Sequence, residues 1–166
     1  MPLDHYLTLG RSGLRVSPFA LGAMTFGEDP GAAGTSVEES EKILGTYLDL
    51  GGNFIDTANF YTNGHSEKIL GDWFAAHPGR REHVVVASKF FGNMFPGEPN
   101  GGGAGRSSII AQLHETLRRL IPTISTCTGC TTGIVTPRSR KRCALSTTWC
   151  AQARSAMSGS PTPRLG

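Results

Sequence analysis

Apolar residues in the first 120 positions gather in short runs that are typical of strands. Three runs rich in β-branched and aromatic residues occur in order, at Val16 to Leu21, Asn53 to Ile55 and His83 to Ser88. Their nearly continuous apolar character predicts strands that are buried on both faces. Before them, two short apolar stretches flank Gly10 to Gly13, which predicts a β-hairpin near the start of the chain.

Three helical patterns separate and follow these runs. The first begins with a capping box at Ser36 to Glu39, carries apolar residues on one face and ends at the two glycines that start with Gly51. The second places apolar residues at helical spacing between Ile69 and Phe74. The third begins at Ser107 or Ser108 and carries an apolar stripe.

The alternation of strand and helix, repeated about every 33 residues, predicts an α/β protein with a parallel sheet. The same unit builds doubly wound sheets and (β/α)8 barrels, and three copies do not separate them. Leu21 to Gly27, which follows the first run, is not a glycine-rich phosphate-binding loop. This absence favours the barrel over the doubly wound sheet.

Charge divides the chain into two parts near Leu120. All 13 acidic and 10 of the 16 basic residues lie at 1–120, a net charge of −3, whereas residues 121–166 hold the other 6 basic residues and no acid. All 4 cysteines also lie after Leu120. No run reaches the roughly 18 apolar residues that a membrane span needs, and the start does not resemble a secretion signal, so we expect a cytoplasmic protein.

Three residues near the predicted strand ends have side chains that could act together chemically. Asp56 follows the second run, Lys89 follows the third, and Tyr61 lies in the loop after the second. In parallel α/β folds, reactive side chains come from the carboxyl ends of strands. A phenol is a weak acid, but a nearby ammonium group favours its ionised form, and a carboxylate keeps that ammonium charged. Taken singly, each residue has an ordinary interpretation: Asp56 as a turn residue, Lys89 as a solvated side chain and Tyr61 as a packing residue.

The chain resembles the aldo/keto reductase family, most closely its bacterial aryl-alcohol-dehydrogenase-like branch. The resemblance rests on residues 54–58 with Tyr61, on residues 64–71, on residues 87–89, and on the hairpin with residues 21–24. It implies an incomplete (β/α)8 barrel, made of the hairpin and the first three β/α units. It also implies reduction of an aldehyde or ketone by a nicotinamide cofactor, usually NADPH, with Tyr61 as the proton donor and with Lys89 and Asp56 tuning it. It further implies that Gly22, Met24, Thr25 and Asp56 line the nicotinamide side of the pocket. The histidines of the chain show no metal-ligand spacing, so we expect no metal site in residues 1–120.

The resemblance stops after Leu120. The family continues with a fourth strand that ends in a histidine, and this chain has no histidine after His114. If one nucleotide were lost near codon 121, residues 123–134 would permit Asp-Tyr-Ile-Asp-Leu-Tyr-Trp-Leu-His-Asn-Trp-Asp in the original frame, with Thr131 at the place of the histidine. We therefore expect residues 1–120 to be the N-terminal part of the barrel and residues 121–166 to be an out-of-frame, largely disordered tail.

Two other interpretations of the tail are open. Cys127, Cys130, Cys143 and Cys150 could form a zinc site, although the second pair is widely spaced. The basic run at residues 138–142 could bind an acidic surface, although such runs are usually solvated and we expect no nucleic-acid partner.

For the whole chain, two functions remain open. The first is a truncated reductase of little or no activity, because the resemblance places the binding of the cofactor's adenosine phosphate in the missing half. The alternative is a non-catalytic half-barrel interaction module with a basic tail. The sequence does not predict the physiological carbonyl substrate, the choice between NADP and NAD, or the oligomeric state.

Overall fold

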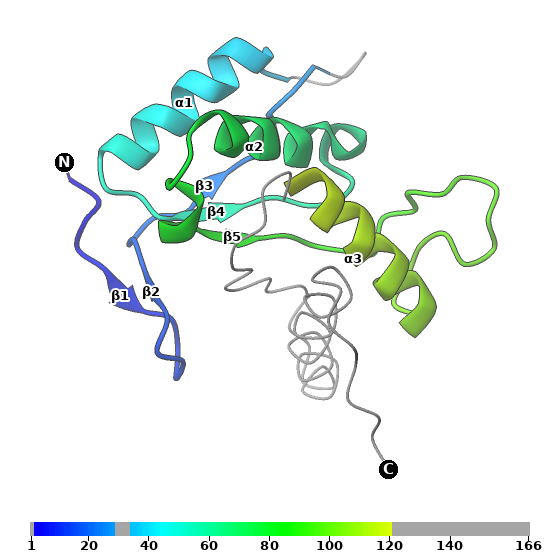
Figure 1. Cartoon of the computed structure of the whole chain (residues 1–166). Helices are drawn as coiled ribbons and strands as arrows, with labels where there is room; N and C mark the ends of the chain where they lie inside the picture. Colours follow the sequence, from blue (N-terminus) through cyan, green and yellow to red (C-terminus); the bar gives the residue numbers. More distant parts are fainter. Residues whose placement is uncertain (1, 29–33, 121–166) are drawn as a thin grey trace.

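In a computed structural model of the chain, residues 2–28 and 34–120 are described (Figure 1). The expected disordered tail at residues 121–166, with Thr131 and the four cysteines, lies outside the described residues. Within them, the chain begins with β1 (Leu7–Thr8) and β2 (Arg15–Val16). These two strands pair antiparallel, with Leu7 opposite Val16, so the predicted hairpin is confirmed.

A parallel three-stranded sheet forms the centre of the described fold. It consists of β3 (Leu21–Gly22), β4 (Phe54–Asp56) and β5 (Val85–Ala87), with β4 in the middle. Ile55 of β4 pairs with Leu21 on one side and with Val86 on the other. The sheet order follows the chain order, as expected for successive β/α units of a barrel wall.

The prediction of one strand from Val16 to Leu21 was wrong. Val16 ends the hairpin strand β2, whereas Leu21 begins the parallel strand β3. Pro18 lies between them, and a proline has no N–H to give to a sheet. The chain therefore leaves one sheet before Pro18 and enters the other after it.

Three α-helices and two short 3₁₀ segments complete the described residues. The helices are α1 (Val37–Asp49), α2 (His65–Ala76) and α3 (Arg106–Leu120), and the 3₁₀ segments are η1 (Tyr61–Gly64) and η2 (Arg81–His83). The side chain of Ser36 accepts a hydrogen bond from the Glu39 amide, as predicted for the cap of α1. Helix α3 begins at Arg106, slightly before the predicted start. Helices α1 and α2 lie along the same face of the sheet (Figure 1).

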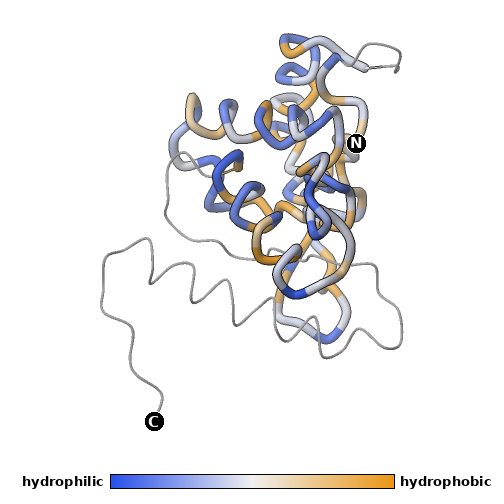
Figure 2. Tube along the Cα trace, turned by 90° about the vertical axis from the view of Figure 1, so that its right-hand side faces the viewer, coloured by the Kyte–Doolittle hydropathy of each residue, from blue (hydrophilic) through white to orange (hydrophobic). Residues whose placement is uncertain are grey.

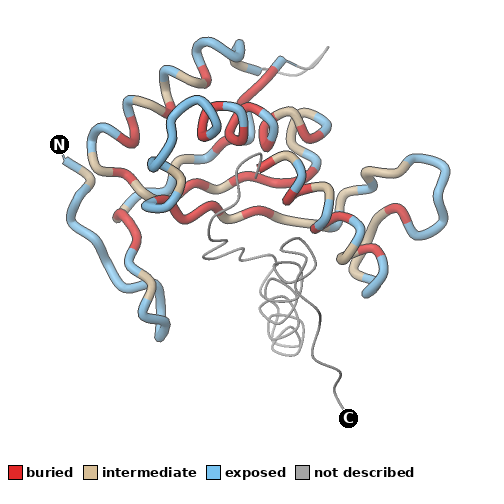
Figure 3. The backbone as a smooth tube through the Cα atoms, viewed as in Figure 1, coloured by how far each residue is buried: buried red, intermediate tan, exposed pale blue. Residues whose placement is uncertain are grey.

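The hydrophobic core lies between this face of the sheet and the helices. Apolar segments of strands and helices alternate with polar ones along the trace, and the buried positions concentrate in the strands and in α2 (Figures 2 and 3). The core consists of Ala23, Phe26, Leu44, Tyr47, Leu48, Ile55, Ile69, Leu70, Trp73, Phe74, Val84, Val86 and Leu120. Burial of these side chains supplies the main driving force for folding.

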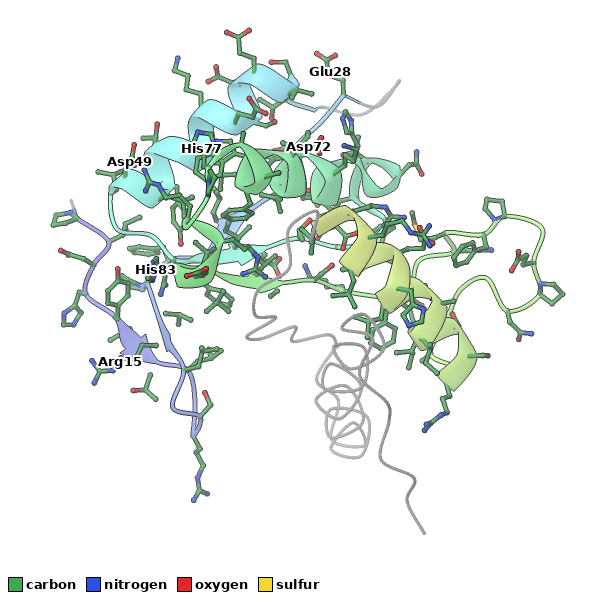
Figure 4. The ribbon with its side chains drawn as sticks, viewed as in Figure 1. Arg15, Glu28, Asp49, Asp72, His77 and His83 are labelled. Atoms are coloured by element: carbon green, nitrogen blue, oxygen red, sulfur yellow. The ribbon has the colours of Figure 1, made fainter. Side chains whose placement is uncertain are left out.

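Charged side chains lie on the outer side of the helical layer. Asp49 of α1 and Asp72 of α2 are exposed, and Figure 4 shows both side chains at this surface. Asp49 pairs with Arg80 at 2.6 Å, and Asp72 pairs with Lys68 at 2.6 Å. Exposed pairs of this kind contribute little to stability, so the fold depends on the core.

Helices α2 and α3 approach each other closely at a glycine. A Cβ atom added at Gly71 would lie 1.8 Å from the backbone oxygen of Arg119. No side chain fits this space, so Gly71 allows the C-terminal end of α3 to rest directly on α2.

The substitution Gly71→Ala tests this packing. Because the added methyl group forces the two helices apart, we expect the free energy of unfolding to fall by about 1–3 kcal/mol in urea titration. Gly45→Ala in α1 is the matched control, since its nearest neighbour is a ring atom of Trp73 at 3.8 Å. That change should be neutral or stabilise the protein by up to about 1 kcal/mol through helix propensity. Equal effects at both positions would contradict the proposed packing.

Candidate functional site

The carboxyl ends of β4 and β5 carry polar side chains that alternate between the two faces of the sheet. Asp56 pairs with Ala87 across the strands, and Lys89 lies two residues after Ala87. The backbones stay paired beyond the strands, since the amide of Thr57 donates to the Ala87 carbonyl at 2.8 Å and that of Asn59 to the Lys89 carbonyl at 3.0 Å. Because side chains alternate along extended chains, Asp56 and Lys89 project from the same face.

The ammonium group of Lys89 is the centre of the site. Its Nζ donates to Asp56 Oδ2 at 2.7 Å, to the backbone oxygen of Thr57 at 2.9 Å and to Tyr61 Oη at 3.2 Å. These contacts use all three N–H donors of the ammonium group. The nitrogen also lies 4.9 Å from the centroid of the Tyr61 ring. The structure therefore brings together the three residues predicted from the sequence.

Tyr61 reaches the site through a tight turn after β4. It is the first residue of η1, and Thr62 and Asn63 behind it adopt positive φ angles of 48° and 53°. Among the described residues, Tyr61 Oη accepts a hydrogen bond from Lys89 and has no acceptor for its own proton.

The pKa of Lys89 shifts upward from 10.5 through opposing effects. Partial burial lowers it, but the hydrogen bonds to Asp56 and Tyr61 and the charge of Asp56 raise it by more. The lysine side chain is 33% exposed, so its ammonium group is only partly screened by water. Lys89 therefore stays charged throughout the neutral range.

Of the residues expected to line a nicotinamide, Gly22 lies beside this cluster. Gly22 pairs with Asp56 in the sheet, and Met24 and Thr25 follow in the next loop. Gly22 and Thr25 are exposed, Met24 is 63% exposed, and a Cβ atom at Gly22 would meet nothing within 4 Å. The described residues thus leave the position of Gly22, opposite Asp56 in the sheet, open.

Two buried polar residues of α2 also belong to the surroundings of the site. Ser66 Oγ lies 2.9 Å from Thr57 Oγ1, and Glu67 Oε1 accepts a hydrogen bond from Ser88 Oγ at 2.6 Å. Thr57 and Ser88 are the neighbours of Asp56 and Lys89 in the sequence. Sequence reasoning gave Ser66 and Glu67 no role of their own; the available signal was their place on the helix face that also carries Ile69 and Leu70.

The described residues show neither a metal cluster nor a membrane helix. Among residues 2–28 and 34–120, no group of three or more histidine, cysteine, aspartate or glutamate side chains could hold a metal ion. Over the same residues, no helix is both long enough and apolar enough to cross a bilayer.

This arrangement defines a class of protein: a parallel α/β fold of the barrel type, with a lysine, an aspartate and a tyrosine gathered at the carboxyl ends of its strands. The sequence pattern of the aldo/keto reductase family matches residues 18–121, and the chain belongs to this family of oxidoreductases. Among its relatives, an aryl-alcohol dehydrogenase of Pestalotiopsis microspora is 38% identical over 122 residues, which are 70% of this chain and 32% of that protein.

A probable voltage-gated potassium channel subunit beta of Oryza sativa is 40% identical over 118 residues, covering 70% of this chain and 34% of that protein. Solved structures show the same relationship. The holo form of an aldo-keto reductase from Bacillus halodurans matches 69% of this chain and 36% of its own, with a TM-score of 0.57 and 29% identity. The chain thus spans about a third of the length of these curated relatives.

The substitution Lys89→Met tests the charge at the centre of the site. A folded-state pKa raised above 10.5 means that the charged lysine stabilises the fold fully below 10.5 and that this effect is lost as the pH rises through the raised value. At pH 8 we expect the variant to lose about 1 kcal/mol of unfolding free energy, a value reduced for partial exposure. Urea midpoints from pH 8 to 11 measure the difference, which should shrink at the upper end.

Lys68→Met is the control for this experiment. Lys68 pairs with Asp72 on the surface, where its side chain is 58% exposed. We expect a change within about 0.5 kcal/mol at every pH. A loss in Lys89→Met that stayed constant to pH 11 would show that packing, and not charge, is what Lys89 contributes.

Proposed function

We propose that residues 1–120 are the N-terminal part of an NADPH-dependent reductase of aldehydes or ketones, in which Tyr61 donates the proton. The observation that carries the proposal is the contact of Lys89 Nζ with both Asp56 and Tyr61. Lys89 donates to the phenol oxygen, which stabilises negative charge there when the proton leaves. Asp56 holds the ammonium in place and keeps it charged.

The nicotinamide ring of the proposed cofactor would lie at the surface beside Asp56. Gly22, Met24, Thr25 and Asp56 would hold the nicotinamide ring, which when bound supplies a hydride for the carbonyl carbon. Tyr61 Oη then gives its proton to the carbonyl oxygen, so that an alcohol results. A relative from Phanerodontia chrysosporium is named an aryl-alcohol dehydrogenase using NADP(+), which supports NADPH as the proposed reductant. Because NADPH is an intracellular reductant, the proposed compartment is the cytoplasm.

Exposed apolar side chains near the site favour an apolar carbonyl compound as the substrate. Phe60 packs edge-on against Tyr61, with 5.1 Å between the ring centroids, and is 45% exposed. Phe91, two residues after Lys89, is 59% exposed, and Met24 also lies open. Apolar side chains around a few polar groups are typical of a small-molecule site.

We also propose that residues 121–166 are out-of-frame translation. The match to the family ends at residue 121, next to the point where acidic residues cease and cysteines begin. A chain with this tail would have little or no activity, because the family's histidine and the adenosine phosphate site would be lost. Sequencing the coding DNA over codons 115–140 tests this directly: a confirmed, uninterrupted frame contradicts the proposal, and a restored nucleotide supports it.

The catalytic role of Tyr61 is tested by turnover of an aromatic aldehyde such as 4-nitrobenzaldehyde, followed by NADPH absorbance. We expect little turnover from the chain as written and measurable turnover from the frame-restored chain. Tyr61→Phe in the restored chain should lower kcat by about a hundredfold or more, because the proton donor is removed. Phe19→Tyr, at an exposed position before β3, is the control and should leave kcat unchanged. Full activity of Tyr61→Phe would exclude the proposed proton donor.

The second candidate function is a non-catalytic interaction module. Several relatives are named as subunits beta of voltage-gated potassium channels, which favours a use of this fold in assembly. A stable complex formed by a chain that binds no NADPH would favour the module, whereas saturable NADPH binding would favour the reductase.

A further inference from the structure

The first turn of α2 contacts the residue that follows each strand of the parallel sheet. Ser66 Oγ lies 2.7 Å from the carbonyl oxygen of Ala23, after β3, and 2.9 Å from Thr57 Oγ1, after β4. Glu67 Oε1 accepts the hydroxyl proton of Ser88, after β5. A two-residue segment of one helix therefore holds all three strand ends from the face opposite to Asp56 and Lys89.

Glu67 is the unusual member of this pair, because its carboxylate is completely buried. The side chain has 0% exposure, and its second oxygen accepts from Arg119 Nη1 of α3 at 2.8 Å. Removing a carboxylate from water is costly, and a buried ion pair seldom adds net stability over an apolar pair of similar size. The pair also does not belong to the Lys89 cluster. A buried pair can still fix the positions of the groups that it joins.

That geometry concerns Lys89 directly. Ser88 precedes Lys89 on an extended chain, so the two side chains point to opposite faces. When Glu67 holds Ser88 against α2, the side chain of Lys89 is directed toward Asp56 and Tyr61. A lysine has a long, flexible side chain, so a fixed backbone at its base limits the positions that its ammonium can reach.

We propose that Glu67 is a positioning residue for Lys89, acting through Ser88, and that Arg119 makes the docking of α3 part of the same arrangement. The catalytic consequence rests on the proposed function, whereas the positioning of the lysine does not. Neither Ser66 nor Glu67 of α2 reaches the face of the sheet that carries the site. Through Ser88, Glu67 nevertheless affects the geometry of the site.

The relative reactivity of the lysine amines measures this positioning without any need for turnover. Trace acetylation of the full chain at pH 9 with acetic anhydride, read by peptide mass spectrometry, gives the rate at Lys89 relative to Lys42. Lys42 is a suitable reference because its side chain is 76% exposed. In the native chain Lys89 should react more slowly than Lys42, because its three N–H donors are engaged.

Four variants separate positioning from general loosening. Ser88→Ala should raise the Lys89 to Lys42 ratio about fivefold, because the hydrogen bond to Glu67 is lost. Ser88→Thr keeps a hydroxyl and should return the ratio toward the native value. Glu67→Leu should raise it as much as Ser88→Ala. Ser40→Ala is the control, since Ser40 is a buried helical serine of α1 that contacts the Thr35 carbonyl and no strand end.

The outcomes decide the proposal in either direction. A native ratio in Ser88→Ala overturns it, as does an equal rise in Ser40→Ala, which would indicate general loosening. If Glu67→Leu does not fold, as far-UV circular dichroism will show, Ser88→Ala and Ser88→Thr alone decide. Failure of the proposed reductase activity would appear only as absent NADPH turnover in the frame-restored chain, and it leaves the amine ratios unaffected.

Discussion

The site depends on one constraint, the two-residue alternation of side chains at the paired ends of β4 and β5. Because the backbones remain paired beyond the strands, Asp56 and Lys89 face one side and Thr57 and Ser88 the other. The first side carries a carboxylate and an ammonium group that contact each other. The other supplies hydroxyls to the helical layer. A shift of the register by one residue would exchange the two sets and remove the site.

The helical layer affects the geometry of the site, although it lies on the opposite face of the sheet. Its first turn in α2 places a fully buried carboxylate, Glu67, between Ser88 and Arg119. Its two oxygens contact Ser88, after β5, and Arg119 of α3, so the position of α3 and the end of β5 become linked. The close contact at Gly71 supports the same link, since it lets the end of α3 lie against α2. Local geometry at Lys89 is therefore set by packing on the far side of the sheet.

The fold and the site differ in how far sequence alone could predict them. Apolar runs and the capping serine located the hairpin, the helices and two of the three parallel strands. The apolar run from Val16 to Leu21 gave a wrong prediction of one strand. Apolar character alone does not show that the chain leaves one sheet before Pro18 and enters another after it. Ser66 and Glu67 were also missed: a polar residue on a helix is normally exposed, and burial of these two depends on strands distant in the sequence.

By itself, the sequence determined the α/β class, the order of the elements and the three residues with a joint chemistry, because periodicity and position after a strand are local properties. It also located the change in composition after Leu120. Only the tertiary structure decided that Lys89 contacts Asp56 and Tyr61 together, and that Glu67 is buried against Ser88 and Arg119. Those contacts join residues far apart in the chain, and they arise from strand register and helix packing, which no short stretch of sequence specifies.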